Sequence, residues 1–257
     1  CIIDGKVGFT GGMNLADEYI NRRVRFGHWK DTSVLLRGAA VRSLTRMFLQ
    51  QWTLNAGSDT LDRPEEEYLT ARALPAQGYV QPYPDSPLDH FNVAENAYLH
   101  LIQRADHYVY ITTPYLILDN EFVTTLKTAA ESGVDVRIIT PSHPDKWYVH
   151  MVSRSYYQTL IQSGVKIYEY QPGFIHAKMC LCDDEAAMVG TANLDYRSLY
   201  LHFECAALLY GCAALADVGE FMMQLEKQSH LVELKECRTS APGLMVSALL
   251  RLLAPLC

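Results

Sequence analysis

The amino-acid sequence predicts an α/β fold of two pseudo-symmetric α/β/α lobes with mixed sheets, the first of them incomplete. Two observations lead to this prediction. Apolar residues alternate between helical and strand periods along residues 93–170, which is typical of a sheet covered by helices. A short motif at the start of the chain also recurs near residue 190, which indicates that the fold is built twice.

The elements of the second lobe follow one another as helix and strand. They are predicted as helices at 93–105, 120–132 and 146–163, strands at 108–112, 134–140, 165–170, 175–182, 186–190 and 203–210, and a helix from there to about 230. An apolar tail, 241–257, is a further helix candidate. We expect it to pack on the domain, with an interfacial contact as the alternative.

The internal repeat relates the start of the chain to residues 183–210. Both segments read D-x6-G-x-x-N at an offset of 179 residues: Asp4, Gly11, Asn14 against Asp183, Gly190, Asn193. A second register, offset by 173 residues, aligns Asp31 with Glu204. Turn residues follow the aspartate in both copies, so each half is predicted to contain a hairpin at this point.

The chain is expected to have three parts. Residues 1–54 are the C-terminal part of a first lobe, residues 55–92 a linker or a loop at the mouth of the site, and residues 93–257 a second lobe. The middle segment is rich in Pro, Asp, Ser and Gly and is longer than most loops. Because the chain opens on Cys1 within a predicted strand, we expect that its start is missing.

Composition restricts the classes of function. The net charge of −7 and the pI of about 5.7 argue against a surface that grips a nucleic-acid backbone. The sequence has no run of about 18 or more apolar residues, which is the length needed to cross a membrane. The seven cysteines are expected to be reduced thiols. Cys180 and Cys182 lack a second pair at zinc-ligand spacing, and we expect both on one buried face of a strand and no metal.

The segment FIHAKMCLCDDEAAMVGTAN carries the chemistry of the second half. It has the spacing HxK-x4-D-x6-G-[ST]-x-N, formed by His176, Lys178, Asp183, Gly190, Thr191 and Asn193. Two residues apart on a strand, His176 and Lys178 face one ligand. Imidazole is a competent nucleophile toward phosphorus, and the ammonium and the Asn193 amide suit the oxygens of a phosphodiester. This arrangement requires no metal or other cofactor.

These residues resemble the phospholipase D superfamily, and the wider sequence resembles its bacterial cardiolipin synthases from end to end. The resemblance rests on IDGKVGFTGGMNLADEYINR, WKDTSVLLRGAAVRSLTRMFLQQW, TPYLILDNEFVTTLKTAAESGVDVRIITP and GTANLDYRSLYLHFE. Thr191 replaces the commoner serine of the motif. The first His-x-Lys falls before residue 1, so this chain by itself is expected to be inactive.

The resemblance implies roles for the acids and the motif residues. It places an orienting acid eleven residues after the motif asparagine, which makes Glu204 the partner expected for His176. By the repeat, Asp31 is then expected to orient the histidine of the other half. Asp183, and by the repeat Asp4, are expected to fix a hairpin. The remaining motif residues of the two halves are Gly11, Gly12 and Asn14, and Gly190, Thr191 and Asn193.

The implied reaction is the transfer of a phosphatidyl group between two phosphatidylglycerols, with release of glycerol through a phospho-histidine. Either histidine of a two-motif site could be the nucleophile. The alternatives are a phosphodiester hydrolase or nuclease of the same superfamily, and a lobe without catalytic activity. The implied setting is the bacterial cell membrane, with contact to its surface, no nucleic acid as partner, and a missing half-lobe that completes the site.

Three further residues are candidate substrate contacts. Tyr115 follows a strand at the edge where α/β sites form, and Arg197 and Ser198 follow the motif closely enough to reach a lipid phosphate. For the last two, a role in fixing the local loop is the alternative.

Overall fold

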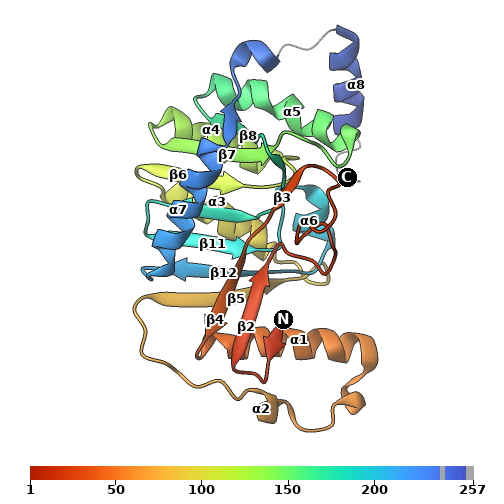
Figure 1. Cartoon of the computed structure of the whole chain (residues 1–257), viewed down its shortest axis with the longest axis vertical. Helices are drawn as coiled ribbons and strands as arrows, with labels where there is room; N and C mark the ends of the chain where they lie inside the picture. The colour runs from red at the N-terminus through yellow and green to blue at the C-terminus, as the bar shows by residue number, and fades with distance from the viewer. Residues whose placement is uncertain (238–240, 253–257) are drawn as a thin grey trace.

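The computed structural model describes residues 1–237 and 241–252, and its centre is one mixed sheet of eight strands (Figure 1). From one edge to the other the strands are β13 (Ser229–Leu231), β8 (Lys166–Tyr170), β7 (Asp135–Pro141), β6 (Tyr108–Thr112), β10 (Met179–Cys182), β11 (Ala186–Gly190), β12 (Glu204–Tyr210) and β5 (Tyr79–Asp85). The neighbours β6, β7 and β8 are parallel, and the other pairs are antiparallel. The predicted α/β class is confirmed.

Side chains of alternating strand positions form a separate core on each face of this sheet. One face is covered by α3 (Val93–Arg104), α4 (Asn120–Glu131) and α5 (Trp147–Gln162). Cys180 and Cys182 point into this core, as predicted, while Met179 and Leu181 point into the other, which α7 (Ala214–Lys227) covers. The period of two along β10 therefore determines which helices each residue meets.

The beginning of the chain packs on the second face. A three-stranded sheet of β1 (Ile2–Ile3), β2 (Val7–Gly11) and β4 (Ser33–Arg37) precedes α1 (Ala40–Ala56). Leu36, Val41 and Leu44 from this part share one core with Met179 and Val189 of the large sheet. Burial of such side chains stabilises each by roughly 1.5–3 kcal/mol, so the two parts hold one another in place.

A second contact between the two parts is a pair of short parallel strands. The strand β3 (His28–Lys30) lies beside β9 (Gly173–Ile175), with Lys30 opposite Ile175. This pairing extends past the strands, because the backbone N–H of His176 donates to the carbonyl of Lys30 at 2.7 Å. The end of β3 therefore lies beside the motif histidine, His176.

The predicted repeat is present as structure, in the register that the two offsets imply. The pair Gly11↔Ser33 of β2 and β4 corresponds to Gly190↔Ala206 of β11 and β12. The turns correspond too, since Asp4 and Asp183 both adopt a left-handed backbone with φ near 50°. The hairpin predicted for each half is therefore confirmed.

Two predicted segments differ from the structure. The strand expected at 175–182 is interrupted between β9 and β10, and residues 176–178 bridge the two without belonging to either sheet. The linker expected at 55–92 contains η1 (Ser58–Thr60), α2 (Glu65–Tyr68) and all of β5, which completes the edge of the large sheet beside β12. Pro82 and Pro84 lower the strand propensity of β5. The strand forms nevertheless because it lies at the edge of the sheet, where proline is tolerated.

The remaining elements close the chain. They are α6 (Tyr196–Leu201), η2 (Leu234–Cys237) and α8 (Ala241–Leu252). The helix α8 packs on α5, with the Arg251 guanidinium 4.3 Å from the ring centroid of Tyr156, so packing on the domain is confirmed; 253–257 lie outside the described residues. Over the described ranges, no helix is long and apolar enough to cross a bilayer.

Replacement of Gly190 by Ala should lower stability. An added Cβ would overlap Ala206 of the neighbouring strand and lie 2.8 Å from its Cα. Overpacking of this kind costs roughly 1–3 kcal/mol in free energy of unfolding, measurable by denaturant titration. The matched control is Gly219→Ala in α7, where the added Cβ meets its nearest atom at 3.4 Å and helix propensity predicts a gain of up to about 1 kcal/mol. Equal effects at both positions would contradict the close strand approach.

Candidate active site

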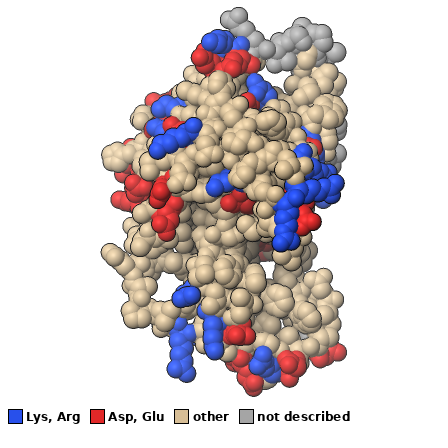
Figure 2. Space-filling view, viewed as in Figure 1, with Lys and Arg blue, Asp and Glu red and all other residues tan. Residues whose placement is uncertain are grey.

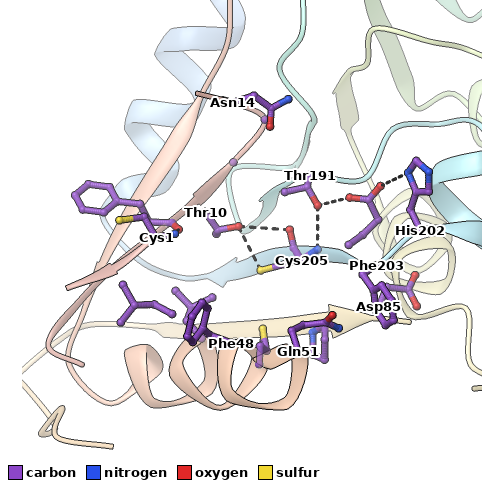
Figure 3. A pocket seen from close by; sticks show the side chains of 18 of the residues that line it. Cys1, Thr10, Asn14, Phe48, Gln51, Asp85, Thr191, His202, Phe203 and Cys205 are labelled. Carbon is purple, nitrogen blue, oxygen red and sulfur yellow. Dashed lines mark hydrogen bonds and ion pairs between the residues drawn. The ribbon is translucent and has the colours of Figure 1, made fainter. Parts of the chain in front are cut away.

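A wide cleft opens between the N-terminal part and the edge of the large sheet. Its volume is ≈ 2050 Å³, and it is lined from both parts of the chain. Figure 3 shows Asn14 on one side and Thr191, His202 and Phe203 on the other. The motif residues on its walls are Gly11, Gly12, Asn14, His176, Lys178, Thr191, Asn193 and Glu204. The structure therefore brings the two halves of the repeat to one place.

His176 lies where the two parts of the chain meet. Its backbone continues β9 beside Lys30, and its side chain is 13% exposed. Aromatic rings surround the imidazole: the ring centroids of Tyr19 and Trp29 are each 5.2 Å away, and that of Phe174 is 6.0 Å away. These rings restrict the orientations that the imidazole can adopt.

The partner of His176 is Asp31, so the prediction of Glu204 as its partner is wrong. Nδ1 of His176 lies 2.8 Å from Oδ2 of Asp31, whose side chain is only 1% exposed. The reason is topological. Asp31 directly follows β3, and the β3–β9 pairing carries it across to the motif of the other half. Because a carboxylate only accepts, Nδ1–H donates, which leaves the lone pair of the neutral ring on Nε2.

Lys178 completes the centre beside the imidazole. Its Nζ lies 2.7 Å from Nδ1 of His176 and donates to the carbonyl of the same residue. Nδ1 cannot both donate to Asp31 and accept from Lys178, and we assign its proton to the hydrogen bond with the Asp31 carboxylate. The Lys178 side chain is buried, which lowers its pKa to about 7, although Asp31, Glu204 and Asp195 oppose this shift. A phosphate anion beside Nζ would favour the charged form.

The pKa of His176 is lowered from its ordinary value. Burial is the main cause, the neighbouring Lys178 charge adds to it, and the hydrogen bond to Asp31 opposes both. The imidazole is therefore neutral at neutral pH, which is the state in which Nε2 can act as a nucleophile.

Glu204 occupies the position in the second half that Asp31 occupies in the first. Its carboxylate accepts hydrogen bonds from the hydroxyls of Thr191 and Ser198, and Nδ1 of His202 lies 3.9 Å away. The backbone repeats as well: Gly12 N–H donates to Thr32 O at 3.1 Å, and Thr191 N–H donates to Cys205 O at 3.0 Å. The two acids are thus equivalent in structure.

The two motif asparagines and Gly12 border the same cleft. Nδ2 of Asn14 donates to the hydroxyl of Tyr19 at 2.9 Å. Oδ1 of Asn193 is buried and has no hydrogen-bond partner among the described residues. At Gly12, a Cβ would overlap Oδ1 of Asp31 and lie 2.8 Å from the carbonyl oxygen of His176, so only glycine permits this approach.

The motif aspartate Asp183 has the structural role that was predicted. Its carboxylate accepts from the backbone N–H groups of Asp106, His107 and Tyr108 at 2.7, 3.1 and 2.6 Å. Burial raises the pKa of Asp183, but these hydrogen bonds outweigh it and hold the pKa below its usual value. The carboxylate ties the β10–β11 turn to the start of β6. Asp4, its equivalent, is exposed and occupies the matching turn.

The three candidate substrate contacts are not on the walls of the cleft. Tyr115 donates its hydroxyl to Asp145 at 2.7 Å behind Phe174. Arg197 donates to His202 at 2.9 Å. Ser198 is 1% exposed and ties Asn193, Asp195 and Glu204 together. None of the three residues lines the cleft. Ser198 has the hydrogen bonds of the loop-fixing alternative, whereas Arg197 is exposed and bonds to His202 through one nitrogen.

Sequence reasoning missed the aromatic surroundings of His176. Tyr19 and Trp29 come from the first segment and Phe174 from the strand before the motif. The signal available was the density of aromatic residues immediately before each motif acid or histidine, as in FGHWKD and FIHAK. Within the described part of the chain, no group of three or more His, Cys, Asp or Glu could hold a metal ion.

Comparison with known proteins agrees with this geometry. Residues 98–228 match a family model described as the cardiolipin synthase, PLD-like domain. The chain is 40% identical to cardiolipin synthase 2 of Bacillus anthracis over 99% of the chain and 50% of that protein, and 49% identical to an uncharacterized protein of Streptococcus mutans over 99% and 55%. A crystal structure of phosphatidylserine synthase from Haemophilus influenzae superposes with a TM-score of 0.72 at 16% identity, over 98% of the chain and 67% of that structure.

The two-fold repeat and the histidine, lysine and acid at its join define a phospholipase D-like protein. Within that class, the chain belongs to the family of the cardiolipin synthase, PLD-like domain. It spans about half the length of the curated relatives that it matches.

The pairing of His176 with an acid from the other half can be tested by titration. Replacement of Asp31 by Asn removes the carboxylate that favours the imidazolium, so the pKa of His176 should fall further below its ordinary value. The ring proton signals of His176 in NMR spectra, assigned with His176→Ala, report this pKa. The control Glu204→Gln should leave the His176 titration in place. If Glu204→Gln moved it and Asp31→Asn did not, the pairing seen here would be wrong.

Proposed function

We propose that the chain provides one catalytic half of a cardiolipin synthase-like phosphatidyltransferase that acts on phosphatidylglycerol. The observation that carries the proposal is the hydrogen bond from Nδ1–H of His176 to the buried Asp31, beside the buried Lys178. It orients a neutral imidazole, with Nε2 as the free lone pair, beside a cation suited to a phosphodiester. Family membership supports the phosphatidyl group as the substrate class.

In this proposal Nε2 of His176 attacks the phosphorus of one phosphatidylglycerol. The bond from phosphorus to the glycerol oxygen breaks, and glycerol leaves after it takes a proton from a general acid. The hydroxyl of a second phosphatidylglycerol then attacks the phospho-histidine and gives up its proton, which regenerates His176 and forms cardiolipin. Lys178 and the amides of Asn14 and Asn193 offset the charge that builds on the phosphoryl oxygens.

The general acid is expected to be the histidine of the first motif. The repeat places it seven residues before Asp4, outside this chain, together with its lysine. Since Asp31 of the first half holds His176 of the second, Glu204 is the acid that would hold the first histidine. The two histidines are equivalent by this symmetry, and either can begin the reaction.

The walls of the cleft support a lipid over a nucleic acid. Apolar side chains from α1 and from the segment before β12 face it, namely Met47, Phe48, Leu54 and Phe203. The acidic net charge disfavours a polyanion of many phosphates. With this substrate, the place of action is the bacterial cell membrane, with the bilayer surface as partner.

The activity test compares this chain with a version extended upstream through the first His-x-Lys. On phosphatidylglycerol vesicles the extended protein should form cardiolipin and glycerol, and His176→Ala should lower the rate by at least about 1000-fold. His100→Ala, an exposed histidine of α3 outside the cleft, is the matched control and should keep the rate. Phosphatidic acid as the product would favour a hydrolase, and no product a lobe without catalysis.

A further inference from the structure

The long loop between β2 and β3, residues 13–27, has one side turned toward the catalytic centre. Tyr19 packs on Trp29, with ring centroids 4.5 Å apart, and meets the His176 ring edge to face. Asn21 makes two hydrogen bonds with the backbone of Trp29, at 3.0 and 2.8 Å, from a left-handed conformation with φ of 57°. The loop is therefore held to the wall of the site by specific contacts.

Other side chains of the same loop are apolar and open to solvent at the mouth of the cleft. Ile20, next to the inward Tyr19, is 54% exposed, and Val24 is 77% exposed. Leu15 is fully exposed. Large apolar side chains gathered on one exposed segment have a cost in water, and such patches mark sites of contact with a partner or a membrane.

Three arginines share this outward side. Arg22, Arg23 and Arg25 are all exposed and alternate with Val24. Arg25 has a long ion pair to Glu18, at 3.8 Å, and its guanidinium lies 5.0 Å from the ring centroid of Phe26. Figure 2 shows Lys and Arg side chains gathered at the edge of the molecule where Figure 1 draws this loop. The chain as a whole has a net charge of −7 and repels anions. The three arginines give this loop a local positive charge that attracts them.

The loop also borders the cleft. Leu15 and Ile20 line it together with His176 and Lys178. A surface that bound this loop would therefore lie at the mouth of the catalytic cleft. Apolar side chains that enter an acyl region, beside arginines at the level of anionic headgroups, are the two components of interfacial membrane binding.

We propose that the outward side of residues 13–27 docks on an anionic phospholipid bilayer and so brings headgroups to the cleft. The inference deepens the proposed function and rests on it for the identity of the lipid. The combination of apolar and basic side chains selects an anionic bilayer over a purely apolar partner, because each arginine adds attraction to anionic headgroups. Through Tyr19 and Asn21, the docked loop is the same segment that holds Trp29 against His176.

A tryptophan introduced into the loop tests the docking without any turnover. The background has the exposed Trp52 and Trp147 replaced by Phe, which leaves the buried Trp29. In this background the emission of Val24→Trp should shift to the blue with phosphatidylglycerol vesicles and should be quenched by brominated acyl chains. The matched control is Met223→Trp, at a position 53% exposed on α7. Figure 1 draws this helix on the opposite side of the molecule from the loop. It should be neither shifted nor quenched.

The arginines are tested by removing their charge. Arg22, Arg23 and Arg25 replaced together by Gln should weaken binding to phosphatidylglycerol vesicles on the order of 100-fold, about fivefold for each residue. The control replaces Arg37, Arg42 and Arg72 by Gln, which changes the net charge equally at exposed positions outside the cleft and should leave affinity within about threefold. Unchanged circular dichroism confirms that each variant is folded.

The outcomes separate the docking from the reaction. No quenching at Val24→Trp, equal quenching at Met223→Trp, or equal loss in both arginine triples would overturn the docking surface. Equal binding to phosphatidylcholine vesicles would overturn the part played by the arginines. Quenching at Val24→Trp without any cardiolipin from the extended protein would leave the docking surface standing and the proposed transfer refuted.

Discussion

The pairing of β3 with β9 is the interaction on which the site depends. Three residues of each strand meet, yet they connect segments about 145 residues apart and place Asp31 against His176. Without this contact, the His176 imidazole beside the buried Lys178 would have no carboxylate to fix its tautomer. A short parallel pair has little stability of its own. The shared core of Leu36, Val41 and Met179 must therefore hold the two parts together while the strands set their register.

The electrostatics of the centre follow from burial. A lysine removed from water loses part of its preference for the charged form, and the acids around Lys178 compensate only partly. The same burial keeps His176 neutral. Under the proposed function, the buried cation of Lys178 beside His176 suits a phosphodiester whose negative charge increases during the reaction.

The two-fold repeat explains why each half needs the other. Each copy presents a hairpin, a motif asparagine and an acid in the same backbone geometry, down to the N–H bond from Gly12 to Thr32 and from Thr191 to Cys205. An acid that served its own half would make each lobe self-sufficient. Because Asp31 instead holds His176 of the other half, the orientation of this imidazole depends on association of the two parts, and the loop before β3 connects it to an exposed, basic and apolar surface.

The sequence by itself determined the periodic and local features. Strands at 108–112 and 186–190 and the helices of the second lobe followed from side-chain periodicity, because burial of one face acts within a single element. The spacing of His176, Lys178 and Asn193 predicted that these residues share one site, and the cleft is lined by all three. Only the tertiary structure decided that Asp31 and not Glu204 meets His176, that 79–85 is a strand, and that Tyr115, Arg197 and Ser198 do not line the cleft. The pairing of Asp31 with His176 and of β5 with β12 depends on contacts between distant segments. A local sequence pattern does not determine which distant segment packs against it.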